Sequence, residues 1–400
     1  MITAAIICEY NPFHKGHLYQ IEYIKKELKA DRIVCLMSGD FVQRGEPAIL
    51  SKEIRTEMAL SMGADLVLLL PAHFSTASAD NFSYGAVSIL NKLGCIDYLC
   101  FGAECPDLSL LTRISEEFSV KATPDNPMIK DLLSKGLTFG EARARVFSEY
   151  EDILKGPNNI LAIEYLISLI KTKSPIKPFL VKRKGADYNS SSIDPDTSLQ
   201  SATALRGLLG AGKFEEAMQY IPSDIHGLFS KSDIVLPEDL DTALFSLLLR
   251  ESDLSCYEDV SFELSMRIKN KLCEYRGFVS FLDTLKTKNL TRARISRALI
   301  HILLNIKGSS RDLPNLADAL DHIRIQGFKK DSSDLLTAIK KSGNITLVTK
   351  VPDVYDSLSA PEKAVFDADL YAATLYDSIS ACKNNTAFTA EYSKTIVIYE

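Results

Sequence analysis

Two histidines separated by two residues are the first candidates for chemistry in this chain. His14 and His17 flank Lys15 and Gly16. At the start of a helix this spacing places both imidazoles on one side of the first turn, where both could reach the oxygens of one phosphate. The free N–H groups and the positive dipole end of such a turn also favour a phosphate. We therefore predict a nucleotide-phosphate site here, with Gly16 letting a base or ribose approach the backbone.

The residues around the histidines predict a strand, a tight loop and a helix. Residues 4–8 form a short apolar run typical of a strand buried on both faces. Pro12 ends this run, because it fixes its own φ and keeps Asn11 out of the helical region. From residue 17 on, apolar side chains recur with a helical period, at Leu18, Ile21, Ile24 and Leu28.

This pattern resembles the His-x-Gly-His signature of the nucleotidyltransferase and class I aminoacyl-tRNA synthetase superfamily. In that superfamily two histidines stabilise the negative charge of a triphosphate while a carboxylate or phosphate attacks the α-phosphorus. Two alternatives are polar histidines in an ordinary turn and a metal-binding pair. The helical zinc pair has i, i+4 spacing with a glutamate between the histidines, so we predict no metal site.

The composition is that of an ordinary soluble protein, with 46% hydrophobic and 24% charged residues. No apolar run approaches the length of a membrane span and no signal peptide precedes the first strand, so we expect a cytoplasmic protein without membrane contact. The net charge of −6 argues against a protein that coats DNA or RNA indiscriminately, but it allows a local basic patch for one folded RNA. Cys95, Cys100 and Cys105 recur at five-residue intervals, and we interpret them as buried, reduced thiols.

The first half of the chain alternates strands and helices. Further strands are expected at residues 32–37, 66–70, 97–101 and 176–181. This alternation predicts an α/β, Rossmann-like nucleotidyltransferase domain over residues 1–210, with a parallel sheet and a site at the carboxyl ends of its strands. Residues 184–200 are expected to form a mobile loop. Helical periods at residues 239–250, 262–274, 278–285, 291–306 and 361–379 predict a mostly helical domain over residues 211–400.

Other candidates lie at the ends of predicted strands. Gly102 could support a base or ribose, or could be a turn glycine; Asn158 could bind ribose or base, or could merely cap a helix. Arg183 and Lys184 could meet phosphates or form a solvated edge.

A second phosphate motif is predicted at residues 201–206. Ser201, Thr203 and Arg206 begin a helix, and their hydroxyl and guanidinium groups could hold the β- and γ-phosphates. A capped helix with one arginine is the alternative.

With these motifs in place, the chain resembles the family of tRNA(Met) cytidine acetate ligases. The likeness covers essentially the whole chain and rests on residues 9–17, 38–45, 101–102, 157–158, 182–183, 291–297 and 324–328. It implies an enzyme that uses ATP to convert acetate to acetyl-adenylate and releases pyrophosphate. The acetyl group then passes to N4 of the wobble cytidine of elongator tRNA(Met), which gives N4-acetylcytidine.

The resemblance also implies site residues. The catalytic residues would be His14, His17, Ser201, Thr203 and Arg206. ATP, expected with Mg²⁺, would bind at Ile7, Cys8, Glu9, Tyr10, Asn11, Pro12, Phe13, His14, Lys15, Gly16, His17, Leu18, Tyr19, Gln20, Gly102, Asn158, Arg183 and Lys184. The chain departs from the family pattern at Asn189 and Ala202, which leaves details of phosphate closure open.

Two further sets of residues are hypotheses from position and charge. Asp40, Gln43 and Arg44 follow the second strand and are our candidates for a tight acetate pocket. The densest basic stretch outside the nucleotide site is our candidate for tRNA phosphate contacts, or else a solvated helix face: Lys286, Lys288, Arg292, Arg294 and Arg297.

Two other functions fit the same signature. A small-molecule adenylyltransferase would use the same fold but would not need nearly two hundred further residues. A tRNA-binding or scaffold protein without catalysis would not need the intact histidines and residues 201–206. Carboxylate preference, tRNA choice and oligomeric state are not determined by the sequence.

Overall fold

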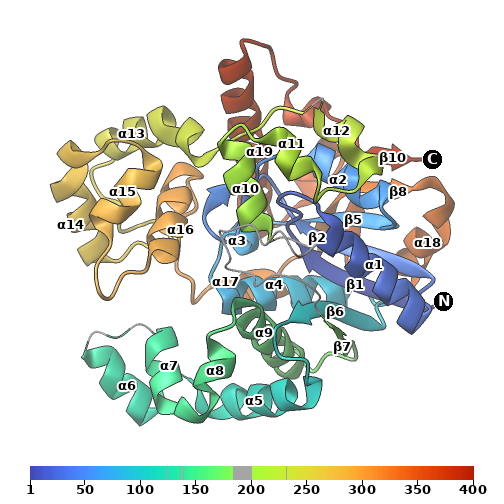
Figure 1. The fold of residues 1–400 in the computed structure, drawn as a ribbon, viewed down its shortest axis with the longest axis horizontal. Helices are drawn as coiled ribbons and strands as arrows, with labels where there is room; N and C mark the ends of the chain where they lie inside the picture. The colour runs from blue at the N-terminus through green and yellow to red at the C-terminus, as the bar shows by residue number, and fades with distance from the viewer. Residues whose placement is uncertain (124, 136, 138, 183–200, 231) are drawn as a thin grey trace.

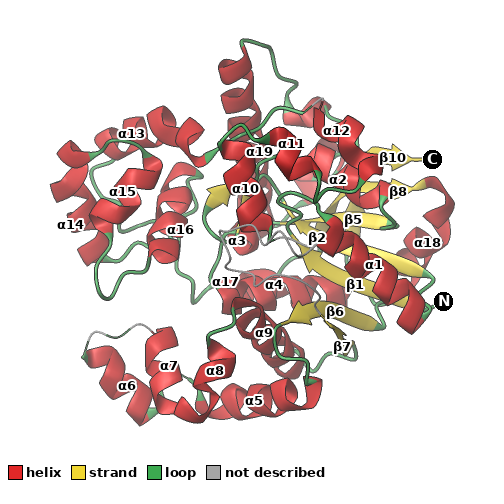
Figure 2. Cartoon of the chain, in the orientation of Figure 1, coloured by secondary structure: helices red, strands yellow, loops and turns green. Residues whose placement is uncertain are grey.

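A computed structural model describes residues 1–123, 125–135, 137, 139–182, 201–230 and 232–400. Its centre is a mainly parallel sheet, which confirms the predicted α/β fold (Figure 2). The strands of the amino-terminal half are β1 (Thr3–Cys8), β2 (Arg32–Ser38), β5 (Leu66–Leu70), β6 (Tyr98–Ala103) and β7 (Lys177–Lys182). They run parallel in the order β5-β2-β1-β6-β7, so their carboxyl ends share one edge. The predicted loop at residues 184–200 lies outside the described residues.

Alternating side chains of these strands face two helical layers. Ala5, Val34 and Leu36 pack with one layer, whereas Ile6 and Cys35 pack with the other. The period of two and the apolar side chains at the centres of these strands explain why both faces of the sheet are buried. One layer contains α1 (Lys15–Leu28) and α2 (Lys52–Ser61), and the other contains α4 (Ala79–Lys92), α5 (Leu108–Lys121) and α9 (Pro157–Lys171).

The carboxyl-terminal half also contributes to this sheet. The strands β8 (His322–Lys329), β9 (Thr346–Val348) and β10 (Val397–Tyr399) extend it beyond β5, and β8 runs antiparallel to β5. Our sequence analysis expected a mostly helical region after residue 210 and did not identify these three strands. The alternation of Ile323 and Ile325 with charged and polar residues is the pattern of a half-buried strand. The proposed division at residue 211 therefore does not follow a boundary of the sheet.

Most of the remaining chain is helical, as expected. Figure 1 shows α13–α16 as a group beside the sheet, and α5–α8 below it. The other elements are β3 (Phe41–Val42), β4 (Glu46–Pro47), α3 (Ala72–Ser75), α6 (Pro127–Ser134), α7 (Phe139–Val146), α8 (Glu151–Leu154), α10 (Ala202–Gly210), α11 (Phe214–Met218), α12 (His226–Ser230), α13 (Asp241–Arg250), α14 (Phe262–Lys271), α15 (Phe278–Leu285), α16 (Arg292–Leu303), α17 (Leu313–Asp318), α18 (Ser333–Ser342) and α19 (Ala360–Asn384).

Candidate functional site

The two histidines of the first motif lie together at the start of α1. His14 is the N-cap, and its Nδ1 accepts the N–H of Gly16 at 3.0 Å. Nδ1 of His17 accepts the N–H of His14 at 3.3 Å. The two rings are stacked with their centroids 3.7 Å apart. Because each ring accepts through Nδ1, the neutral form of each carries its proton on Nε2, where it can serve as a donor.

The structural reason for a glycine at position 16 differs from the one that we expected. A Cβ at this position would lie 2.8 Å from Cε1 and 3.0 Å from Nδ1 of His14. The imidazole of His14 thus occupies the space that we had assigned to an approaching base or ribose. Gly16 is needed first for the orientation of His14.

Two buried aromatic side chains pack against the ring of His17. The ring centroid of Tyr10 lies 4.9 Å from that of His17, and the centroid of Phe13 lies 5.5 Å from it. Tyr10 and Phe13 are themselves in edge contact at 4.8 Å, and both are buried. This packing restricts the imidazole of His17 to one orientation.

The second predicted motif reaches the first. Arg206 of α10 donates from Nη1 to the carbonyl oxygen of Asn11 at 2.9 Å, and its Nη2 lies 3.4 Å from Oγ1 of Thr203. Ser201 caps α10 by accepting the N–H of Ala204 at 3.1 Å. The structure therefore brings Arg206 to the loop that precedes His14, with Thr203 beside Arg206 and Ser201 at the start of the same helix.

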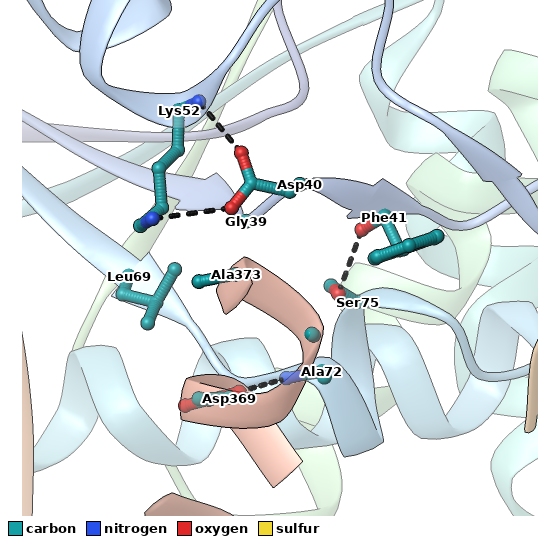
Figure 3. A pocket seen from close by; sticks show the side chains of 10 residues that line it. Gly39, Asp40, Phe41, Lys52, Leu69, Ala72, Ser75, Asp369 and Ala373 are labelled. Carbon is teal, nitrogen blue, oxygen red and sulfur yellow. Dashed lines mark hydrogen bonds and ion pairs between the residues drawn. The ribbon is translucent and has the colours of Figure 1, made fainter. Parts of the chain in front are cut away.

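Asp40 does not have the surroundings of an acetate ligand. Its carboxylate is buried, pairs with Nζ of Lys52 at 3.2 Å and accepts the N–H of Lys52 at 2.8 Å (Figure 3). Burial alone would lower the pKa of Lys52, but the charges of Asp40, Glu53 and Glu391 raise it above its ordinary value. Asp40 thus stabilises the start of α2, and a second carboxylate beside it would be repelled. A small cavity here is bordered by Asp369 of α19 (Figure 3).

The other acetate candidates lie on the hairpin formed by β3 and β4. The N–H of Gln43 donates to Oε1 of Glu9 at 2.9 Å, and Arg44 is close enough to lower the pKa of that carboxyl, which burial raises. The hairpin therefore touches the first motif through Glu9.

Asn158 is held by a carboxylate that our sequence analysis missed. Its Nδ2 donates to Oε1 of Glu104 at 2.6 Å, and the N–H of Asn159 donates to Oε2 at 2.8 Å. Glu104 therefore caps the amino end of α9. Its position directly after β6, at the same edge as the start of α9, is the signal that could have found it. Gly102 lies in β6 and pairs with Val181. Arg183, Lys184 and Asn189 lie outside the described residues.

The five RNA candidates have unlike surroundings. Lys286 and Lys288 are exposed, and Arg292 is exposed but pairs with Asp283 at 3.0 Å. Arg294 is half-buried. Arg297 pairs with Asp259 at 3.0 Å, and their side chains are 15% and 12% exposed. Arg297 therefore belongs to the packing of α16 and is poorly placed to contact RNA phosphates.

In the part of the chain that the structure describes, no three His, Cys, Asp or Glu side chains form a group that could hold a metal ion. Among the same residues, no helix combines the length and apolar character that crossing a membrane requires.

Comparison with known proteins gives one family. A model of the HIGH Nucleotidyl Transferase family matches residues 1–391. A tRNA(Met) cytidine acetate ligase of Clostridium perfringens is 35% identical over 95% of this chain and 96% of its own length. The protein of that name from Thermoanaerobacter sp. is 37% identical over 93% of this chain and 94% of its own. The crystal structures of Thermotoga maritima TmcAL in the apo state and bound with alpha-thio ATP superpose with TM-scores of 0.91 and 0.89, at 26% and 27% identity, over the whole of both chains.

Proposed function

The chain belongs to the family of tRNA(Met) cytidine acetate ligases, and we propose that it acetylates N4 of the wobble cytidine of elongator tRNA(Met) in two steps, of which the first consumes ATP. The observation that carries the proposal is the stacked pair of His14 and His17, with Arg206 reaching the same loop. These groups combine donors and positive charge at a helix start, which is the environment that a triphosphate requires.

In the first step an acetate oxygen attacks the α-phosphorus of ATP. The bond to the bridging oxygen breaks, acetyl-adenylate forms and pyrophosphate leaves. His14 and His17 would donate from Nε2 to phosphate oxygens as negative charge develops. Arg206, with Ser201 and Thr203 at the start of α10, would stabilise the leaving pyrophosphate. In the second step the N4 amine attacks the acetyl carbonyl, AMP leaves, and the amine loses a proton.

ATP would lie along residues 7–20, with Gly102 and Asn158 at the same edge of the sheet. Arg183 and Lys184, which lie outside the described residues, stay ATP-binding candidates from the family resemblance alone. The binding of alpha-thio ATP by the Thermotoga maritima relative supports this ligand class. We propose that Mg²⁺ enters as part of the MgATP substrate, because Mg²⁺ is usually bound through substrate phosphates and water.

The acetate site is proposed near Gln43 and Arg44, since the hairpin meets the first motif at Glu9. Arg44 is the cation on this hairpin, and its charge already acts on the Glu9 carboxyl. Asp40 is removed from this proposal because it pairs with Lys52.

The tRNA surface is proposed at Lys286 and Lys288, in the segment between α15 and α16, and at Arg292 and Arg294 in the first turn of α16. The α16 helix packs directly on the hairpin: Oγ of Ser296 donates to the carbonyl oxygen of Gly45 at 2.7 Å. This contact supports a route by which RNA on α16 reaches the nucleotide site. A tRNA substrate would be met in the cytoplasm, as the sequence analysis expected.

A carboxylate screen tests the function. Purified protein is incubated with ATP and acetate, propionate or formate, with and without total tRNA, and pyrophosphate release and acetylated cytidine are measured. We expect acetate-dependent pyrophosphate release and N4-acetylcytidine only when tRNA is present. Release that depends on a small mononucleotide instead of a carboxylate would favour the small-molecule adenylyltransferase, and tRNA binding without any release would favour a scaffold.

A further inference from the structure

Arg55 of α2 is fully shut off from solvent, with an exposed fraction of 0%. Its guanidinium donates to main-chain carbonyl oxygens: Nε to Leu50 at 2.9 Å, Nη1 to Glu9 at 2.7 Å and to Ser38 at 3.0 Å, and Nη2 to Gly39. A buried charge is tolerated only when its donors are satisfied, and the fixed fork of an arginine satisfies several at once. A single ammonium group could not reach all four carbonyls.

These carbonyls belong to three segments that meet at the carboxyl edge of the sheet. Glu9 follows β1 and opens the loop that leads to His14, Ser38 and Gly39 end β2 and open the hairpin, and Leu50 precedes α2. The carboxylate of Glu9 also accepts the N–H of Gln43 in the hairpin. Arg55 and Glu9 together hold the first loop and the hairpin at a fixed separation.

The two loops are the ones that would carry the two reactants of the first step. ATP is proposed on the first loop and acetate beside the hairpin. In-line attack needs the reacting atoms about 3–3.5 Å apart, and an error of about 1 Å can reduce the rate about a hundredfold. We propose that Arg55 is a positioning residue for acetyl-adenylate formation, which acts through the carbonyls of Glu9, Ser38 and Gly39. This inference rests on the proposed function.

The test is R55K, assayed by acetate-dependent exchange of labelled pyrophosphate into ATP. Lysine retains the positive charge but lacks the planar guanidinium that binds several carbonyls at once. The loop after β1 and the hairpin should therefore shift relative to each other, while each keeps its own contacts with ATP or acetate. We expect kcat to fall about 10- to 100-fold, and KM for ATP to change less than about threefold. Titration of ATP sites by calorimetry gives the concentration of folded enzyme, so kcat is expressed per folded molecule.

A matched control lies at the opposite end of β2, the strand whose carboxyl end Arg55 binds through Ser38. Arg32 begins β2 and joins it to Asp65 at 3.1 Å and to Asp334 of α18 at 3.0 Å. R32K removes a comparable guanidinium brace far from the carboxyl edge, so we expect a lower melting temperature and an unchanged kcat per folded molecule.

Three results would overturn the positioning role. R55K and R32K could have the same kcat per folded molecule, R55K could raise KM for ATP with kcat unchanged, or R55K could yield no folded protein, which would make Arg55 a folding requirement. Absence of acetate-dependent exchange in the unaltered protein is a separate result, which would overturn the proposed function and this inference with it.

Discussion

The imidazole of His14 fills the space in which a side chain at Gly16 would have to lie, because a Cβ there would come within 2.8 Å of Cε1. The glycine between the two histidines therefore determines where one of them points. The ring of His14 in turn stacks on that of His17, so a residue without a functional group controls the geometry of two residues that have one.

This relationship predicts the effect of G16A. The added methyl group should displace the ring of His14 and lower acetate-dependent pyrophosphate exchange by about 10²- to 10³-fold, as H14A and H17A should each do directly. Alanine is the better helix former, but displacement of His14 also removes its cap bond to the N–H of residue 16, so the melting temperature should change little. G227A is the control, since nothing lies within 4 Å of a Cβ there and exchange should stay normal. Exchange by G16A at the unaltered rate would contradict the assigned role of the histidines.

Charge reversal just before α16 and in its first turn tests the proposed tRNA surface. Lys288 is exposed and Arg294 is half-buried, and K288E/R294E should weaken tRNA binding. The slope of log K against log salt should become shallower by about two phosphate contacts. Acetyl-adenylate formation without tRNA should survive, because ATP and acetate are proposed to bind elsewhere. Binding is measured by filter retention at several salt concentrations.

Two comparisons make that result specific. K340E/K341E reverses two exposed charges on α18, on the other side of the molecule (Figure 1), and should leave tRNA binding unchanged. R297E should instead lower both activities together, because Arg297 pairs with Asp259 in the packing of α16. If K288E/R294E binds tRNA as tightly as the unaltered protein, the RNA lies on another surface.

We expect Asp40 to contribute to the stability of the fold and not to acetate binding. In D40A the buried ammonium of Lys52 loses its contact at 3.2 Å but keeps Glu53 at 2.8 Å and Glu391 at 3.0 Å, and the N–H of Lys52 loses its acceptor. Leaving this buried donor unsatisfied should cost about 1–3 kcal/mol. The loss should be visible as a lower free energy of unfolding in urea, while KM for acetate of the folded fraction stays close to normal. D131A, which breaks the exposed pair with Lys135, should cost at most about 1 kcal/mol. A large rise in KM for acetate with normal stability would return Asp40 to the acetate pocket.

The strands of the first half could be predicted because burial on both faces leaves a simple apolar run. Residues 66–70 were predicted as a strand and form β5 with the same limits. β8 was not predicted because only about one side chain in two is apolar. β10 was not predicted because three residues are too few to show a strand period. The place of β8 in the sheet depends on pairing with β5, whose residues lie more than two hundred positions away, and β10 in turn pairs with β8.

The site shows the same division between local and distant information. His14, His17 and residues 201–206 could be found because their own spacing suggests chemistry. Arg55 could not, since its partners are main-chain carbonyls. Glu104 was missed because its partner is the start of a helix about fifty residues away, and its place directly after β6 was the one local signal. Nothing in the sequence next to Arg297 shows that Asp259 will neutralise it.

Glu258 makes the stability of the fold depend on pH. Its side chain is 2% exposed, accepts a hydrogen bond from Oγ of Ser310 at 3.3 Å and lies beside Asp259. Burial, reinforced by the charge of Asp259, raises its pKa from 4.5 to about 8, although Ser310 and Arg297 oppose the rise. The folded protein therefore holds this proton more tightly than the unfolded chain does. The resulting stabilisation is fully present below pH 4.5 and is lost as the pH rises toward 8.

E258Q removes this titration while its amide oxygen can still accept from Ser310. The free energy of unfolding is measured in urea for both proteins at several values between pH 5 and 8. We expect the unaltered protein to lose stability relative to E258Q steadily across this range, with little further change above pH 8. Asp369, whose pKa burial raises to about 6, titrates in both proteins and cancels in the difference. A difference that is constant from pH 5 to 8 would mean that Glu258 has the same proton affinity in the folded and unfolded chains.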